Sequence, residues 1–278
     1  MPLHVAIDFG LTNIDAVLRN PNGKLESIIV LGDSWPILTQ FEAVLETFGH
    51  PAQDFEWIAV TGGQFRQLPS SYRSARLIAV SEVPAIGRGG QHLAGLPSGQ
   101  GALVVSAGSG TAIVAARGCQ AHYVTGSAVG GGTLQGLGQL LLGTADPLEI
   151  DRLAVQGDAN AADLTLLEAI GSTVGSLPPD ANAVNFGRLA RQAVDLSRED
   201  LAAAIVRLVG QVIAVIAVNA AHAENLESIV ILGHLVDLPS VRQVLYTTAG
   251  YYQATIIVPP YPGTGTVIGA LLCAEDNK

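Results

Sequence analysis

The sequence has very little sulfur, with only one methionine and two cysteines, Cys119 and Cys273. The two cysteines lie far apart in the chain, so they suggest neither a disulfide framework nor metal-ligand spacing. The six histidines are scattered and contain no His-x-x-x-His pattern. These absences argue against a zinc site. We expect both cysteines to be reduced and without a functional role, in a cytosolic protein.

Charged residues are also scarce. Asp, Glu, Lys and Arg make up 14% of the chain, and the formal net charge is -10. A protein with this balance lacks the positive surface that binds nucleic acid through its phosphates, so we expect no nucleic-acid partner. Nucleotides are still possible ligands, because backbone amides and a bound cation can supply a positive field locally.

The N-terminus has no basic region followed by an apolar run, so we expect no signal peptide. The most apolar stretch, residues 201–221, is interrupted by Arg207, Gln211 and Asn219. Those side chains would strongly destabilise a membrane span, so we interpret the stretch as a buried or dimer-facing helix. We therefore expect a cytoplasmic protein with no membrane partner.

Apolar residues and glycine are abundant. Hydrophobic residues make up 49% of the sequence, which predicts a large, well-packed core. Glycine has no Cβ to keep main-chain N–H groups away from a ligand, so glycine-rich loops suggest close approach to one. Many of the 32 glycines concentrate in four short loops, namely Thr61-Gly62-Gly63, Gly108-Ser109-Gly110, Gly130-Gly131-Gly132 and Pro262-Gly263-Thr264-Gly265.

The predicted elements repeat in order along the chain. Turn signals and apolar periodicity predict a strand meander over residues 4–31, followed by helix 37–48, strands 57–60 and 77–80, and helix 82–93. A second series contains strands 102–106, 111–116 and 121–125, helices 134–142 and 198–223, strand 229–232, helix 239–248, strand 255–258 and helix 266–273.

This duplication predicts an α/β protein with two lobes and a cleft between them. We expect residues 1–96 to form the first lobe and residues 97–278 to form the second. The second lobe carries an additional segment, which we expect to be a helical insert at about residues 147–200.

The first strand of the first lobe ends in an acidic residue and a tight turn. Asp8 ends the strand, and Gly10, Thr12 and Asn13 supply amide and hydroxyl donors. Such a turn can cradle phosphate oxygens while Asp8 holds Mg²⁺ through water. A hairpin with an incidental acid fits the same residues.

A second turn of the same kind follows the first strand of the second lobe. It contains Ser109 and Gly110 between two predicted strands. Two such turns, one in each lobe, are harder to explain as incidental hairpins than either turn alone.

Two further glycine sites follow in the second lobe. Gly130, Gly131, Gly132 and Thr133 precede a predicted helix, so we expect their exposed N–H groups and the positive end of that helix to form an anion site. Gly233 ends a strand where an adenine ring could lie against bare backbone. Taken singly, each of these loops also fits an ordinary turn.

Together and in order, these segments resemble the type II pantothenate kinase family across nearly the whole chain. This family belongs to the acetate and sugar kinase/Hsp70/actin superfamily, which implies a duplicated ribonuclease H-like fold with ATP between two lobes. The more diagnostic segments are the glycine triplet within residues 124–138 and Asn185-Phe186-Gly187. The others are residues 8–12, 61–63, 82–87, 108–110, 229–233, 261–265 and 269–271.

The resemblance implies ATP- and Mg²⁺-dependent phosphorylation of the primary hydroxyl of pantothenate, the first step towards coenzyme A. Glu82 matches the general base of the family, and Ser109 matches a serine that contacts nucleotide or substrate. Tyr123 and Gly126 fall in the segment that contacts substrate. Family members are dimers, so we expect a homodimer.

The chain departs from the family pattern at three positions. Leu11 replaces a glycine, Asp15 replaces a lysine, and Tyr123 replaces an arginine. Loss of one well-placed cation or donor typically costs about 10²–10³ in rate. Two alternatives therefore stay open: a kinase of the same fold with another small substrate, or a nucleotide-binding protein that no longer catalyses.

Cations elsewhere in the chain could compensate for these losses. Arg66, Arg88 and His122 are the nearest to the glycine loops in sequence, although solvated surface charges would give the same pattern. Dehydratase activases share the expected fold and bind an iron–sulfur cluster. The positions of Cys119 and Cys273 argue against that interpretation.

Overall fold

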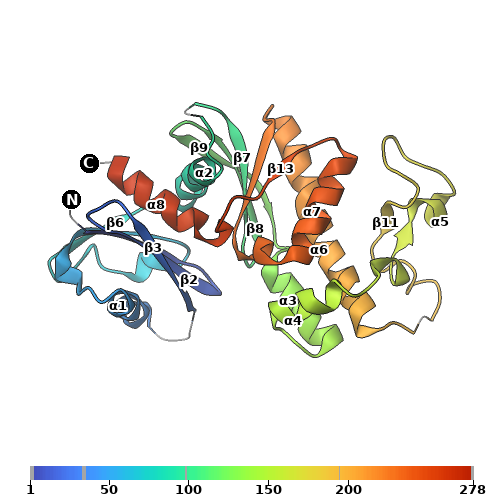
Figure 1. Ribbon diagram of the computed structural model, residues 1–278, viewed down its shortest axis with the longest axis horizontal. Coiled ribbons are helices and arrows are strands. Elements are labelled where there is room, and N and C mark those ends of the chain that lie inside the picture. Colours follow the sequence, from blue (N-terminus) through green and yellow to red (C-terminus); the bar gives the residue numbers. More distant parts are fainter. Residues whose placement is uncertain (1–2, 33–35, 98, 194, 277–278) are drawn as a thin grey trace.

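The computed structural model describes residues 3–32, 36–97, 99–193 and 195–276. It contains two main β-sheets with helices packed on both faces of each, and a smaller appendage at one end (Figure 1). The N-terminal residues form one sheet, and residues from Ala102 onward form the other. This is the two-lobed α/β arrangement that the repeated order of elements predicts.

The sheet of the N-terminal lobe begins as an antiparallel meander and adds parallel strands beside β1. Its order is β3-β2-β1-β4-β6-β5. The turn between β2 and β3 forms where predicted, and Gly23 adopts φ +84° there. The strands are β1 (Leu3–Phe9), β2 (Asn13–Arg19), β3 (Leu25–Leu31), β4 (Phe55–Thr61), β5 (Ser71–Tyr72) and β6 (Ala75–Ala79).

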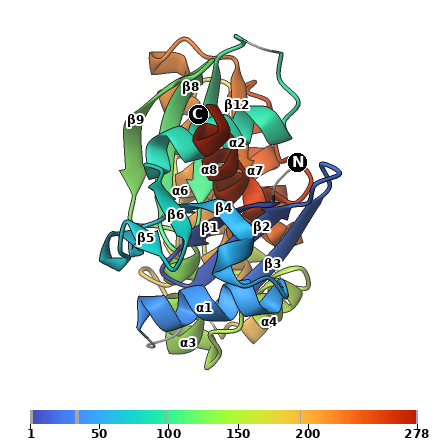
Figure 2. The same cartoon turned by 90° about the vertical axis from the view of Figure 1, so that its left-hand side faces the viewer.

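Alternate residues of this sheet pack on different helices, as the two-residue period of a strand requires. Val5 and Ile7 belong to a core that includes Phe41 of α1 (Ile37–Thr47). Ala6, on the opposite face, belongs to a core that includes Leu271 of α8 (Gly265–Asp276). Figure 2 shows α1 and α8 on opposite sides of the sheet.

The sheet of the C-terminal lobe is also covered on both faces. Its order is β13-β12-β7-β8-β9. Leu103 and Val105 pack with Ile205 of α6 (Arg198–Ala223), and Val104 packs with Ile86 of α2 (Glu82–Leu93). The strands are β7 (Ala102–Ala107), β8 (Thr111–Arg117), β9 (Gln120–Ser127), β12 (Ser228–Leu232) and β13 (Ile256–Ile257). The other long helices are α3 (Gly131–Leu142) and α7 (Pro239–Tyr251).

Helix α6 is long and apolar enough to cross a membrane by length and composition. In the structure it instead lies in the core of the C-terminal lobe, where Ile205, Val209 and Ile213 are fully buried. A core helix passes the same test of length and composition, so α6 does not indicate a membrane protein. Residues 201–221 therefore form a largely buried helix, which is one of the two interpretations that the sequence left open.

Helices α2 and α8 cross between the two sheets with their backbones in close contact. A methyl group added at Gly269 would lie 1.8 Å from the carbonyl oxygen of Ala85, and one at Gly89 would lie 1.9 Å from that of Gly265. No real Cβ approaches a backbone atom so closely, so these glycines allow the two helices to touch backbone to backbone. The crossing also joins the lobes, because α8 packs against β1 and α2 against the second sheet.

The segment at residues 147–200 is less helical than we expect from the sequence. It contains two short helices, α4 (Pro147–Ala154) and α5 (Leu166–Ile170), and a ribbon of β10 (Leu164–Thr165) and β11 (Asn182–Val184). Turns and bends make up most of the remainder of its described residues. Glycine and proline, for example Gly171, Gly175 and Pro178-Pro179, explain the short elements, because both residue types interrupt helices.

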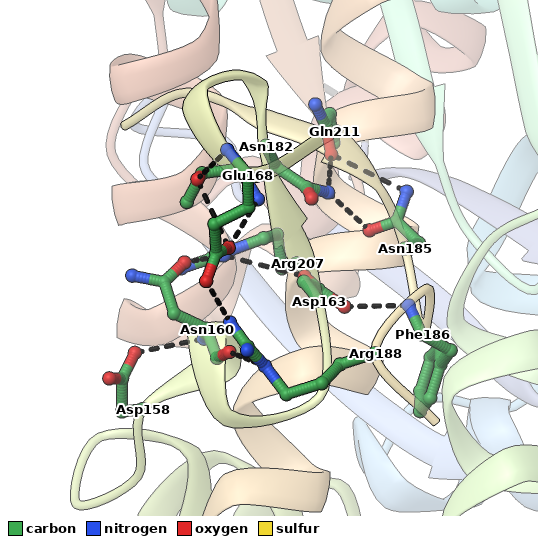
Figure 3. A network of polar contacts seen from close by, with 11 residues as sticks. Asp158, Asn160, Asp163, Glu168, Asn182, Asn185, Phe186, Arg188, Arg207 and Gln211 are labelled. Carbon is green, nitrogen blue, oxygen red and sulfur yellow. Dashed lines mark hydrogen bonds and ion pairs between the residues drawn. The ribbon is translucent and has the colours of Figure 1, made fainter. Parts of the chain in front are cut away.

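A network of polar side chains attaches this segment to α6 (Figure 3). The fully buried Asp163 accepts a hydrogen bond from the backbone N–H of Phe186 at 2.7 Å and pairs with Arg207 of α6 at 3.4 Å. Arg207 also donates to the side chain of Asn160 at 2.6 Å. Asn185-Phe186-Gly187, one of the diagnostic segments, therefore has a clear structural role, because it is held on α6 through Asp163.

We expect Asp163→Ala to lower the free energy of unfolding by about 2–3 kcal/mol, because it leaves the Phe186 N–H and the Arg207 guanidinium without their buried partner. Urea unfolding followed by circular dichroism measures the change. Asp195→Ala, at an exposed site nearby, is the control and should change stability by less than about 0.5 kcal/mol. Equal stability of both variants would contradict a structural role for the network.

Candidate functional site

A cleft of about 770 Å³ lies between the lobes. Residues of both predicted turns line it, together with loops that follow β4, β12 and β13. Of the residues singled out from the sequence, the cleft collects Asp8, Gly10, Thr12, Asn13, Glu82, Ser109, Gly110, Gly131 and Gly233.

The turn of the N-terminal lobe is held by its own backbone. A methyl group at Gly10 would lie 2.6 Å from the carbonyl oxygen of Asn13, so only glycine fits this position. The carbonyl oxygen of Thr12 accepts a hydrogen bond from the N–H of Gly32 at 2.8 Å. These contacts leave the Thr12 side chain exposed at the cleft.

The turn of the C-terminal lobe meets the first turn across the cleft. The hydroxyl groups of Thr12 and Ser109 are 2.6 Å apart and share a hydrogen bond. The two residues are 97 positions apart in the chain and belong to different lobes. The cleft therefore narrows to a point where both turns present hydroxyl groups to the same small volume.

The glycine triplet, Gly130-Gly131-Gly132, does not form the open anion site that we expect from the sequence. The N–H groups of Gly131 and Gly132 donate to the carbonyl oxygens of Gly108 and Ser109 at 2.8 and 2.9 Å. A methyl group at Gly130 would lie 2.7 Å from the carbonyl oxygen of Ser109. These N–H groups are used to hold the turn at Ser109, so the expectation that they form an open anion site is corrected.

Thr133 also has a structural partner. Its hydroxyl group bonds to the carbonyl oxygen of Ala128 at 3.2 Å and lies 3.3 Å from the N–H of Gly130. Thr133 does not line the cleft. It helps to fix the start of α3 behind the turn.

Carboxylates gather at the floor of the cleft. Asp8 and Asp15 are direct cross-strand partners in the β1–β2 ladder, and both line the cleft. Burial, with a smaller effect of the negative charges of Asp15 and Glu82, raises the pKa of Asp8 to about 7. Gly62, with φ +88°, allows the β4 loop to pass beside Asp8, because a methyl group there would lie 2.5 Å from its Oδ1 atom.

Glu82 is the first residue of α2. It is exposed, and no hydrogen bond joins its carboxylate to another residue in the part of the chain that the structure describes. A carboxylate at a helix N-terminus is favoured by the helix dipole. Its position in the cleft also leaves it free to accept a proton from a bound hydroxyl group.

His234 lines the cleft and was not singled out from the sequence. Its Nε2 lies 2.8 Å from Oδ1 of Asp15, and its Nδ1 lies 2.9 Å from Oδ2 of Asp237. Hydrogen bonds to both carboxylates raise its pKa to about 10. Asp15, which replaces the family lysine, is therefore paired with a cation from the other lobe. Only the position of His234 directly after Gly233 could have drawn attention to it.

The three cations considered from the sequence do not line the cleft. Arg88 pairs with Asp276 at 3.2 Å, and His122 pairs with Glu224 at 3.1 Å. Arg66 lies over the ring of Phe65. The interpretation of these residues as surface charges is the one that the structure favours.

Tyr123 and Gly126 lie on β9 and do not line the cleft. Gly126 pairs across the sheet with Ala112, which does line it. The side chain of Tyr123 is largely exposed and covers Gly126, where an added methyl group would lie 2.5 Å from the tyrosine hydroxyl. Gly126 therefore borders the cleft, and Tyr123 lies beside Gly126.

One wall of the cleft is apolar. Leu134 of α3, Leu148 of α4, and Leu235 and Leu238 near Gly233 form it. Leu148 is 71% exposed. This wall can accommodate a flat apolar group beside the polar turns.

The cleft fits a magnesium ion by the chemistry of its donors. Asp8 offers carboxylate oxygens, the ligands that Mg²⁺ prefers. Burial, and to a smaller extent the charges of Asp15 and Glu82, raises its pKa, and a bound divalent cation would stabilise the ionised form. No group of three ligating side chains occurs among the described residues. A magnesium ion would therefore depend on phosphate oxygens of a ligand for further coordination.

Comparisons with known proteins agree with this geometry. The chain is 27% identical to a type II pantothenate kinase of Staphylococcus haemolyticus, over 97% of this chain and 98% of that protein. Its fold is similar to the activator of 2-hydroxyisocaproyl-CoA dehydratase from Clostridium difficile with bound ADPNP, with a TM-score of 0.66, 16% identity, and coverage of 99% and 95% of the two chains.

A glucokinase of the ROK family from Streptomyces griseus, in complex with glucose and AMPPNP, has a TM-score of 0.64 and 13% identity, with 99% of each chain covered. These structures confirm the duplicated fold of the actin/Hsp70/sugar kinase superfamily. The sequence model of the Fumble family matches residues 98–256, more than half of the chain. The chain therefore belongs to the Fumble family, as the resemblance to type II pantothenate kinases predicts.

Proposed function

We propose that this protein is an ATP-dependent kinase that phosphorylates the primary hydroxyl group of pantothenate. The observation that carries the proposal is the contact between Thr12 and Ser109, which brings the turns of two lobes together beside Asp8 and Glu82. The full-length similarity to a type II pantothenate kinase supports the choice of substrate.

In this proposal the hydroxyl groups and amides of the two turns bind the phosphates of ATP. The contributing residues are Gly10, Thr12, Asn13, Ser109 and Gly110. Gly130, Gly131, Gly132 and Thr133 hold the second turn in position. The adenine ring lies against Gly233 and the leucine wall.

Glu82 acts as the general base. It takes the proton of the substrate hydroxyl group while the substrate oxygen bonds to the γ-phosphorus. The bond from the γ-phosphorus to the bridging oxygen breaks in line, and ADP leaves with that oxygen. Asp8 would hold Mg²⁺, which neutralises charge on the transferring phosphoryl group. Ser109, Tyr123 and Gly126 contact the substrate at the border of the cleft near β9.

We also propose a cytoplasmic homodimer. Leu208, Val212 and Val215 form an apolar, partly exposed stripe on the outer side of α6. A second copy would remove this stripe from water. Sedimentation velocity would give the mass of a dimer in that case, and the mass of one chain would contradict it.

Turnover of ATP with Mg²⁺, with and without pantothenate, tests the proposed function. We expect ADP to be released only when pantothenate is present, in a one-to-one ratio to phosphopantothenate measured by mass spectrometry. Pantothenate-independent ADP release, or release with a different hydroxyl compound only, would contradict the proposed substrate.

A second candidate is a nucleotide-binding protein without turnover. Asp15 in the cleft favours it, as does the lack of any lysine or arginine among the described residues that line the cleft. Stabilisation of the fold by ADP without turnover on any hydroxyl compound would support this candidate over the kinase.

A further inference from the structure

The cleft contains an unusual balance of charge. Among the described residues that line it, the acids are Asp8, Asp15, Glu82 and Asp237, and His234 is the sole residue that carries a positive charge. A nucleoside triphosphate would add several more negative charges to the same volume. Besides a bound Mg²⁺, a positively charged side chain in the cleft would reduce the repulsion between these acids and the phosphates.

His234 is charged because of where its two nitrogens point. Each ring nitrogen lies within 2.9 Å of a carboxylate oxygen, at Asp15 in one lobe and at Asp237 in the other. An ionised carboxylate accepts hydrogen bonds and does not donate them, so a ring that bonds to two ionised carboxylates carries a proton on each nitrogen. The ring is therefore an imidazolium, in agreement with its raised pKa.

The chain holds this ring in a fixed position. A methyl group on Gly263 would lie 2.1 Å from Cε1 of His234, so the loop before α8 closes over the ring only because residue 263 is glycine. On the other side, Gly233 adopts φ +100° and lies against the backbone of Ala107. Two of the glycine loops noted in the sequence thus serve to position His234.

Asp15 is the acid that most requires such a partner. It is 7% exposed and sits directly across the β1–β2 ladder from Asp8, the proposed magnesium ligand. Both acids line the same cleft as Thr12 and Ser109, and their negative charges would repel phosphate there. The bond to His234 cancels one of those charges.

We propose that His234 is a positioning residue for phosphate: by neutralising Asp15 from the opposite lobe, it allows the phosphates of a nucleotide to enter this acidic cleft. The inference rests on the proposed function only in assigning the cleft to a nucleotide. The alternative is a latch, in which the bond between His234 and Asp15 only holds the two lobes together. The two roles differ in what they predict for Asp15→Asn, because neutralisation by His234 is unnecessary once residue 15 has no charge.

Binding of AMP, ADP and ADPNP to the full chain in the presence of Mg²⁺, measured by calorimetry, tests this inference. The variants are His234→Gln, Asp15→Asn and the double variant. We expect His234→Gln to bind ADPNP about 10- to 100-fold more weakly, because it leaves Asp15 uncompensated. The loss should be smaller for ADP and smallest for AMP, since a repulsion grows with the charge of the ligand.

The Asp15→Asn variants separate the two explanations. Asp15→Asn alone should bind ADPNP as tightly as the original protein or more tightly, and the double variant should regain most of the affinity lost in His234→Gln. A latch predicts the opposite, since Asp15→Asn also weakens the bond between the lobes. Failure of the double variant to regain affinity, or equal losses for AMP and ADPNP, would overturn the inference.

Two further variants and a measurement of folding complete the design. His122→Gln removes a histidine that pairs with Glu224 on the surface, and it should leave all three affinities unchanged. Melting temperatures show whether each variant is folded. Gly263→Ala displaces the His234 ring without removing its charge, so it should reproduce part of the loss of ADPNP affinity. Failure of the original protein to bind any of the nucleotides would contradict the proposed function as well, whereas normal binding by His234→Gln would contradict this inference alone.

Discussion

Glu82→Gln is expected to lower kcat by about 10³-fold, within the range that general bases contribute, while the affinity for ATP stays within about twofold. The reason is the position of Glu82. It lines the cleft at the start of α2, with no hydrogen bond to another described residue, so the carboxylate is free to take a proton and has no evident role in holding the fold. Glutamine has the same shape but accepts no proton.

Steady-state turnover and calorimetry on the same preparation measure both quantities. Glu46→Gln, at an exposed position on α1, is the matched control and should leave turnover unchanged. Turnover of Glu82→Gln at the original rate would show that another group takes the proton. A parallel loss of ATP affinity would show instead that Glu82 binds nucleotide.

Gly269→Ala is expected to lower the free energy of unfolding by about 3 kcal/mol, at the upper end of typical overpacking costs. The added methyl group would lie 1.8 Å from the carbonyl oxygen of Ala85 and 2.7 Å from the backbone nitrogen of Gly89. Backbone atoms of a helix cannot rotate away as a side chain can. Helices α2 and α8 must therefore separate, which loosens the packing between the two lobes.

Gly136→Ala is the matched control, because it is the same substitution inside a helix. Nothing lies within 4 Å of the methyl group that it would add. Alanine is the better helix former, so the control should raise the free energy of unfolding by roughly 0.5–1 kcal/mol. Urea unfolding of both variants measures the difference, and equal stability would contradict the close helix crossing.

Most of the fold could be predicted from the sequence because its elements have strong local signals. The ranges of α2 and α6 match the predicted residues, 82–93 and 198–223. The residues at 147–200 lack such a pattern. Their structure depends on the buried pair of Asp163 and Arg207, which lie 44 positions apart in the chain.

The candidate site could likewise be predicted only in part from the sequence. The two turns were predictable because glycine, hydroxyl and acidic residues follow predicted strands, and the fold then brings Thr12 and Ser109 together. His234 was not predictable, because its partner Asp15 lies 219 positions away. The role of the glycine triplet was also hidden, since sequence does not show which N–H groups are already bonded to Gly108 and Ser109.

A crystal structure of the full chain with Mg²⁺, ADPNP and pantothenate would test the central claim most directly. The account predicts phosphate oxygens within hydrogen-bonding distance of Thr12 and Ser109, with the pantothenate hydroxyl group within hydrogen-bonding distance of Glu82. Phosphates bound elsewhere in the cleft, or a pantothenate hydroxyl group far from Glu82, would contradict it.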